Sequence, residues 1–197
     1  MKLQPRLLIL CALFATAAVR ADLANTKEQG APEWIKNTLP NANHEVLKNF
    51  VGKWKNTAKF WMEPNAKAEE MTGTTNNTLI MGGRFLQTNH SGKAQKGQPA
   101  FSGMGLLGYD VVRDEFQSSW IDNMNTALMA TTGGKYDPAT KTLTEEGTTS
   151  CPITGDKNKW FRAEWKIVDA KTYHYSMFSK TKEGAEYKSL EITYKKI

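Results

Sequence analysis

One short segment, Gly52–Trp54, constrains the fold of this chain more than any other. It follows residues 44–51, whose apolar side chains fall on one side of a short helix. After it, residues 54–62 alternate between apolar and polar side chains, which is typical of a strand with one buried face. Asn43 is the expected N-cap of the helix, and Gly52 is its expected end. The sequence therefore predicts a short helix that leads directly into the first strand of a sheet.

The rest of the chain consists of strand-like runs separated by short turn signals. The pair Gly82-Gly83 predicts a two-residue hairpin turn that places Met81 opposite Arg84, because glycine readily adopts positive φ. Roughly ten such runs favour an antiparallel meander over alternating β-α units. We therefore predict an all-β fold, a single antiparallel meander β-barrel of about 8–10 strands with a short N-terminal helix.

The N-terminal residues have the pattern of a secretory signal peptide. Lys2 and Arg6 precede an apolar run, residues 7–19, and the candidate cleavage sites are Val19-Arg20-Ala21 and Ala15-Thr16-Ala17. We expect residues 1–21 to be a cleaved signal peptide and the mature protein to be secreted or periplasmic. Residues 22–43 form a polar N-terminal arm or linker, and residues 44–197 form the barrel domain.

Composition excludes several classes of partner. The formal charge is +6, but three of the 26 basic residues lie in the expected signal peptide, and no basic stripe with interleaved aromatic residues appears. Nucleic-acid binding is therefore not expected. After the signal peptide, no apolar run is long enough to cross a membrane. Cys151 is the cysteine left in the mature chain, so no internal disulfide is expected there. The oligomeric state stays open.

Several motifs together give the chain a family resemblance. They lie in the segments 44–47, 51–54, 80–87, 103–110, 120–124, 136–143 and 190–194. Among them are Val51-Gly52-Lys53-Trp54, Ile80-Met81-Gly82-Gly83-Arg84-Phe85-Leu86-Gln87 and Trp120-Ile121-Asp122-Asn123-Met124. On these residues the chain resembles a family of mostly bacterial, secreted proteins, the domain of unknown function family 1579. The resemblance covers about residues 42–197.

The resemblance implies a lipocalin-like, or calycin-like, barrel whose interior often holds one small ligand. It brings no established activity, and a barrel of this kind hosts many unrelated functions. In related barrels the tryptophan of Gly-x-Trp packs under a basic side chain from the last strand. Lys188 or Lys195 is the expected partner of Trp54 here.

Two charged residues are candidate polar anchors for such a ligand. Arg84 shares a strand face with Leu86, and Asp122 shares one with Trp120. If the apolar neighbours point inward, each charge points into the barrel, where it requires a partner. Alternatively, each residue lies at a strand end, where it reaches solvent or caps a turn.

The three histidines give little support for a metal or cofactor site. No His-x-His or His-x-x-x-His pattern occurs, so no metal site is predicted. His174 is the candidate ligand if the barrel binds haem or another cofactor, as nitrobindin-like barrels do. The identity of any cofactor stays unknown. Gly-x-Ser-x-Gly is absent, and no catalytic residue is assigned.

These observations favour an exported, non-enzymatic barrel that binds a small, largely apolar molecule in its interior. Glycines at 103 and 105 would make room for the ligand, because they carry no side chain. The candidate ligand-binding residues are Trp54, Phe60, Arg84, Gly103, Gly105, Trp120, Asp122 and Trp165. Three alternatives remain: a cofactor barrel that uses His174, a hydrolase or isomerase with its site at the barrel mouth, and a filled barrel whose outer surface binds a partner.

Overall fold

The computed structural model describes residues 32–94, 97 and 99–197. The chain divides into two compact units, Met1–Leu39 and Pro40–Ile197. In the described part of the first unit there is one short helix, α2 (Glu33–Lys36). The signal peptide expected at residues 1–21 lies outside the described residues.

The second unit is a barrel with a short helical segment at its start. The helical segments are α3 (Ala42–Leu47) and the single 3-10 turns η1 (Lys48–Phe50) and η2 (Met81–Gly83). The strands are β1 (Gly52–Phe60), β2 (Glu69–Ile80), β3 (Phe85–Gly92), β4 (Ser102–Asp110), β5 (Glu115–Asp122), β6 (Met129–Asp137), β7 (Thr142–Thr149), β8 (Lys159–Asp169), β9 (Thr172–Lys180) and β10 (Glu186–Lys196).

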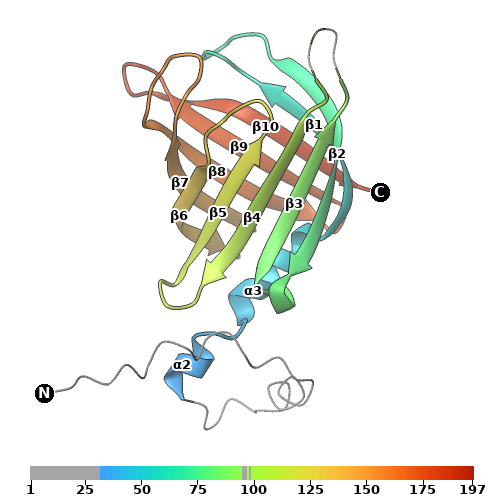
Figure 1. The fold of residues 1–197 in the computed structure, drawn as a ribbon, viewed down its shortest axis with the longest axis vertical. Coiled ribbons are helices and arrows are strands. Elements are labelled where there is room, and N and C mark those ends of the chain that lie inside the picture. Colours follow the sequence, from blue (N-terminus) through green and yellow to red (C-terminus); the bar gives the residue numbers. More distant parts are fainter. Residues whose placement is uncertain (1–31, 95–96, 98) are drawn as a thin grey trace, which may run out of the picture. The chain divides into compact units, whose positions relative to one another are not determined.

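The strands form a closed antiparallel meander. Each strand pairs with the next along the chain, and β1 pairs with β10 to close the barrel (Figure 1). Trp54 lies opposite Lys196 and Phe60 lies opposite Leu190 along this closing pair. The predicted all-β meander barrel with a short N-terminal helix is confirmed, with ten strands within the described residues.

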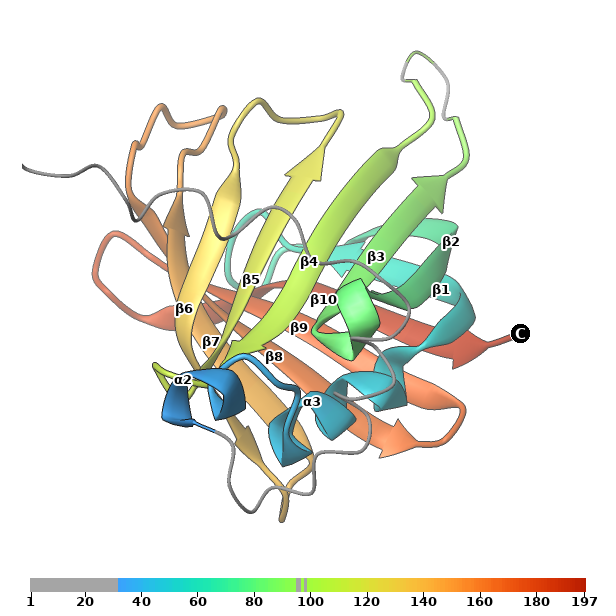
Figure 2. The ribbon, with the colours of Figure 1, turned by 60° about the horizontal axis from the view of Figure 1, so that its bottom comes forward.

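The helix α3 and the turn η1 cover one end of the barrel (Figure 2). The helix begins two residues earlier than predicted, because Asn41 rather than Asn43 is its N-cap. The Asn41 side chain accepts from the Asn43 N–H at 3.0 Å, and the Asn41 N–H donates to His44 Nδ1 at 3.0 Å. These two bonds form a capping box, which fixes the helix start. Val46, Leu47 and Phe50 are buried as the amphipathic pattern predicts.

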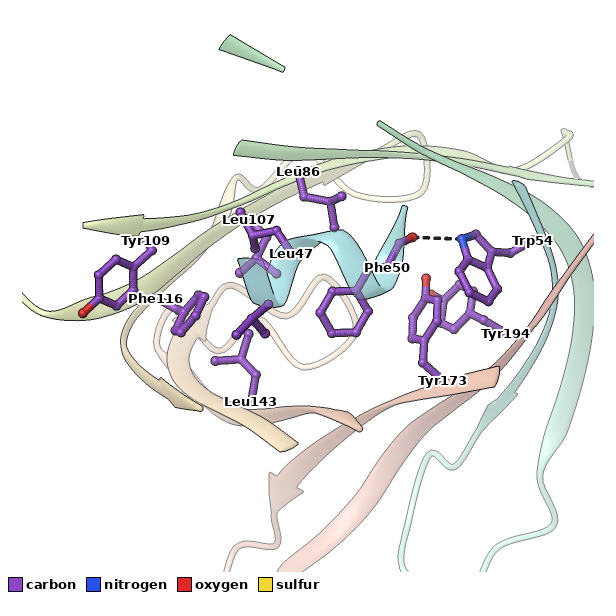
Figure 3. Close-up of a cluster of buried hydrophobic side chains, with 11 residues drawn as sticks. Leu47, Phe50, Trp54, Leu86, Leu107, Tyr109, Phe116, Leu143, Tyr173 and Tyr194 are labelled. Atoms are coloured by element: carbon purple, nitrogen blue, oxygen red, sulfur yellow. Dashed lines mark hydrogen bonds between the residues drawn. The ribbon is translucent and has the colours of Figure 1, made fainter. Parts of the chain in front are cut away.

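The hydrophobic core lies at this covered end. Figure 3 shows Leu47 and Phe50 of the helical segment among side chains that point inward from several strands. The strand residues of this cluster are Trp54, Leu86, Leu107, Tyr109, Phe116, Leu143, Tyr173 and Tyr194. The helical segment therefore acts as a plug that packs its apolar face against the inner face of the sheet.

Trp54 connects the plug to the barrel wall. Its indole Nε1 donates to the Phe50 carbonyl oxygen at 2.9 Å, and its ring meets Tyr173 edge-to-face at 4.8 Å between centroids. The Nζ atom of Lys196 lies 5.2 Å from the centre of the indole ring. A basic side chain from the last strand thus covers Trp54, as the family resemblance implies, but it comes from Lys196 rather than Lys188 or Lys195.

The hairpin between β2 and β3 keeps the predicted register but has a longer turn. The ladder ends at Ile80 opposite Phe85, so residues 81–84 form the turn. Met81, Gly82 and Gly83 all have positive φ, which is incompatible with a further ladder pair at Met81.

Candidate functional site

The two ends of the barrel interior differ in solvent exposure. At the end covered by α3, the central inward side chains such as Leu86, Phe116 and Leu143 are at most 1% exposed, and half-buried residues such as Leu79 and Ile167 surround them. At the other end, inward-facing apolar side chains are only half-buried: Phe60, Met71, Trp120, Met129, Met177 and Leu190. Solvent therefore reaches apolar, inward-facing side chains at the end opposite α3, and we call this part of the barrel interior the lumen.

Strand register defines which side chains face this lumen. Phe60 pairs with Leu190, Leu190 with Met177, and Met177 with Ala163, which is fully buried. The same row continues from Ala163 to Glu145 on β7. Because paired residues lie on the same face of a sheet, the apolar wall continues into a buried carboxyl group.

Glu145 is the centre of a buried polar cluster. It is 2% exposed, and its Oε2 lies at hydrogen-bond distance, 2.7 Å, from Thr131 Oγ1. Its Oε1 accepts from Ser118 Oγ at 2.9 Å and from Trp165 Nε1 at 3.0 Å. Burial raises the pKa of Glu145, and these three hydrogen bonds oppose that rise. Side chains from β5, β6 and β8 thus converge on one carboxyl group of β7.

His90 on β3 also faces the lumen. Its ring meets Trp120 and Tyr194 edge-to-face, with centroid separations of 5.0 and 5.7 Å, and the Tyr194 hydroxyl lies 3.5 Å from His90 Nε2. Burial lowers the pKa of His90 to about 4. The imidazole is therefore neutral at neutral pH.

The glycines at 103 and 105 make room for a side chain of the barrel itself. A β-carbon at Gly103 would lie 2.3 Å from the Trp120 ring, and one at Gly105 would lie 3.0 Å from it. Phe101 stacks against the same indole at 6.4 Å between centroids. The space that the glycines were expected to leave for a ligand is thus occupied by Trp120, whose indole forms part of the lumen wall.

Asp122 fixes the orientation of that indole. Its Oδ2 accepts from Trp120 Nε1 at 2.7 Å. Its Oδ1 accepts from the N–H groups of Met124 and Asn125 at 2.8 and 2.9 Å, at the end of β5. Asp122 therefore lies beside the lumen and also caps a turn, so both interpretations of this residue apply.

Substitution of Gly103 by alanine is expected to destabilise the barrel by about 1–3 kcal/mol, because the new methyl group overlaps the Trp120 ring. Urea denaturation measures the loss. The double variant Gly103→Ala/Trp120→Phe removes the atoms that clash, so it should lose less than the sum of the two single variants. Additive losses would show that the close approach between Gly103 and Trp120 does not determine stability here.

The remaining predicted residues lie at different places. Phe60 belongs to the lumen wall and Trp54 to the core, whereas Trp165 packs against the core, with its ring 5.5 Å from that of Phe50 in the plug. Arg84 lies in the turn before β3, and its Nη1 donates to the Met81 carbonyl at 3.2 Å. Burial lowers the pKa of His44 in α3, and the positive charge of Arg84 lowers it further. Arg84 therefore lies near the plug and not at the open end.

His174 lies on the outer face of the barrel. It pairs with Lys166 on one side and Thr193 on the other, and its Nδ1 lies 3.1 Å from Thr193 Oγ1. Its neighbours Tyr173 and Tyr175 face inward, so alternation directs His174 outward. This geometry does not support a lumenal haem bound by His174.

Sequence reasoning missed Glu145 and His90. Both residues share a strand face with buried neighbours, Glu145 with Leu143 and His90 with Leu86. That alternation is visible in the sequence and could have marked both as inward polar residues. What the sequence lacks is any sign that Ser118, Thr131 and Glu145, on three different strands, meet.

The outer wall carries a groove of about 710 Å³ between β6 and β7. Its lining includes the outward-facing residues Thr132, Lys135, Glu146 and Trp160, and also Glu145 and Gly147 of β7.

In the described parts of the chain, no group of three or more His, Cys, Asp or Glu could hold a metal ion. None of the described helices has both the length and the apolar character needed to cross a membrane.

Known structures and families place the chain among barrel proteins. The crystal structure of Rv2717c from M. tuberculosis is similar, with a TM-score of 0.58 and 15% identity, covering 80% of this chain and 98% of that chain. This likeness concerns the fold alone.

Two other barrels are more distant. A redesigned β-barrel, b11L5F_LGL, has a TM-score of 0.38 and 13% identity, covering 77% of this chain and 95% of that chain. EF1p2_mFAP2b bound to DFHBI has a TM-score of 0.39 and 10% identity, covering 78% and 98%. Comparison with curated proteins finds no match. A family profile described as "Protein of unknown function (DUF1579)" matches residues 39–196, so the chain belongs to this family, as its motifs indicated.

Proposed function

We propose that this protein is an exported, non-enzymatic barrel that holds a small, largely apolar molecule in its lumen. The observation that carries the proposal is the difference between the two ends of the interior. At one end the plug packs among side chains that are almost fully buried, whereas the inward apolar side chains at the other end all keep accessible surface. Apolar surface that faces inward yet meets solvent is stabilised when an apolar ligand covers it.

The polar groups of the lumen support a binding role. Ligand pockets combine apolar walls with a few convergent polar groups, which here come from the Glu145 cluster, His90 and Tyr175. The carboxyl groups of Glu145 and Asp122 are each held by three hydrogen bonds from the barrel itself. Such bonds fix a scaffold, so these groups fit the wall of a binding site better than a catalytic acid or base.

Export is the second part of the proposal. It rests on the sequence of residues 1–21, with its basic start, apolar run and small residues. A cleaved signal peptide would deliver the barrel to the periplasm or beyond. N-terminal sequencing of the protein from the culture medium or periplasm tests this part, and an intact Met1 would contradict it.

Ligand binding is expected to change tryptophan fluorescence, because the half-buried indole of Trp120 lines the lumen. The test is a titration with a panel of apolar molecules, preceded by native mass spectrometry of protein from its source. The variant Trp120→Phe should lose much of the fluorescence change. Trp160→Phe, on the outer wall beside Lys180, is the matched control and should keep it. A protein that carries no small molecule and gives no response to the panel contradicts the proposal.

A further inference from the structure

The Glu145 cluster contains a closed triangle whose corners are the Glu145 carboxyl group, the Ser118 hydroxyl and the Thr131 hydroxyl. Ser118 Oγ lies 2.9 Å from Glu145 Oε1, Thr131 Oγ1 lies 2.7 Å from Glu145 Oε2, and the two hydroxyl oxygens lie 2.7 Å apart. All three separations are hydrogen-bond distances. Each side of the triangle therefore requires one proton.

Counting protons shows that two hydroxyl groups are not enough. Ser118 and Thr131 carry one hydroxyl proton each, and an ionised carboxylate carries none. If both hydroxyls donate to Glu145, the contact between Ser118 and Thr131 holds two oxygen atoms at 2.7 Å with no proton between them. If one hydroxyl donates to the other, one of the two contacts between a hydroxyl and Glu145 has no proton instead.

The other donors near the triangle cannot supply the missing proton. The Ser118 N–H donates to Thr131 Oγ1 at 3.0 Å, and Trp165 Nε1 donates to Glu145 Oε1 at 3.0 Å. In both bonds an oxygen of the triangle accepts a proton from nitrogen, so neither bond places a proton between two of the oxygens. A proton on the carboxyl group closes the ring: Oε2–H donates to Thr131, Thr131 donates to Ser118, and Ser118 donates to Oε1.

The surroundings of Glu145 favour the same neutral form. The carboxyl group is almost fully buried, and burial is the main cause that raises its pKa. Burial raises the pKa of Tyr175, the titratable neighbour on β9, which keeps that phenol neutral. Among the described residues, no lysine or arginine is buried. No buried lysine or arginine therefore stabilises a carboxylate at Glu145.

We infer that Glu145 is a neutral carboxylic acid in the folded barrel and that the lumen takes an uncharged ligand rather than an anion. The second half of this inference rests on the proposed function. Because Glu145, Tyr175 and His90 are neutral, a charged ligand group beside them would lose its hydration without gaining a counter-ion. An alcohol, ketone or ester is compatible with such a lumen, whereas a carboxylate is not.

Infrared spectroscopy tests the charge of Glu145 directly. At pH 7 the wild-type protein should show a protonated-carboxyl C=O band that is absent in Glu145→Gln and present in the control Glu146→Gln. Glutamine can donate and accept as the neutral acid does, so Glu145→Gln should fold and be at least as stable as the wild type at pH 7. Identical wild-type and Glu145→Gln spectra in this region, or a large loss of stability in Glu145→Gln, would overturn the inference.

A matched pair of ligands tests the ligand class. The probes are 1-hexadecanol and hexadecanoate, which share one chain and differ in charge, and binding is followed by Trp120 fluorescence. Lys159, at the start of β8, is the half-buried cation that shares the inward face with Phe161 near the open end. The titrations are therefore run in the wild type and in Lys159→Gln.

The alcohol is expected to bind about tenfold or more tightly than the carboxylate in both proteins. If the carboxylate binds as tightly as the alcohol in either protein, the uncharged-ligand inference is wrong while the proposed function stands. If neither probe nor any other apolar molecule binds, the proposed function is wrong and the ligand class falls with it. In that case the infrared spectra still test the first half of the inference, the charge of Glu145.

Discussion

The variant Trp54→Ala is expected to lose about 3–5 kcal/mol of stability, because it removes a large buried side chain from the junction of plug and wall. A typical domain is stable by only about 5–15 kcal/mol, so the variant should be close to unfolding at room temperature. In the wild-type protein, the Trp54 ring contacts Tyr173 and lies near Lys196, and its indole N–H donates to the Phe50 carbonyl of the plug. Urea denaturation followed by circular dichroism measures the loss.

Two further variants separate packing from hydrogen bonding. Trp54→Phe keeps an aromatic ring but loses the bond to the Phe50 carbonyl, which still accepts from Asn77 Nδ2 at 2.8 Å. Its loss should be smaller than that of the alanine variant, because no buried acceptor is left without a donor. Trp160→Ala, on the outer wall, should lose least. Equal losses for Trp54→Ala and Trp160→Ala would contradict the role of Trp54 as the anchor of the plug.

Acidification from pH 6.5 to pH 4 is expected to destabilise the barrel by roughly 3 kcal/mol through His90 alone. In the unfolded chain His90 takes up a proton near its ordinary pKa of 6.5, whereas burial lowers its pKa to about 4 in the barrel. The unfolded state therefore binds more protons in this interval, so the free energy of unfolding falls as the pH falls. His44, whose pKa is also lowered, acts in the same direction.

The variant His90→Gln isolates this effect. Glutamine is polar and does not titrate, so the variant should lose less stability than the wild type between pH 6.5 and pH 4. Glu145 acts with the opposite sign, because its raised pKa makes stability fall as the pH rises above its ordinary value of 4.5. Both proteins contain Glu145, so its contribution cancels in the comparison. Parallel curves of stability against pH would show that His90 does not titrate as its burial implies.

The fold was predictable because its signals are local. Alternation along each strand, turn residues between strands and the Gly52–Trp54 segment are all visible within about ten residues of sequence. The helix start was displaced by two residues because both Asn41 and Asn43 are suitable caps, and tertiary packing selects between them.

The candidate site was predictable where its parts lie on neighbouring strands. Trp120, Asp122 and the glycine at 103 come from the adjacent strands β4 and β5, and the structure brings them together. Glu145 and His90 were missed because each is a single polar residue in a long alternating strand. Their roles depend on the register of several strands in series, and no local pattern determines that register.

The pairing of β1 with β10 also determines the order of events during folding. Residues near Trp54 must wait for their partners near Lys196, because β10 is synthesised after the other nine strands of the barrel. Until then the growing sheet has two unpaired margins whose backbone N–H and C=O groups can join a neighbouring chain. The long sequence separation between β1 and β10 slows their pairing. A polypeptide that still lacks β10 is therefore most prone to aggregate.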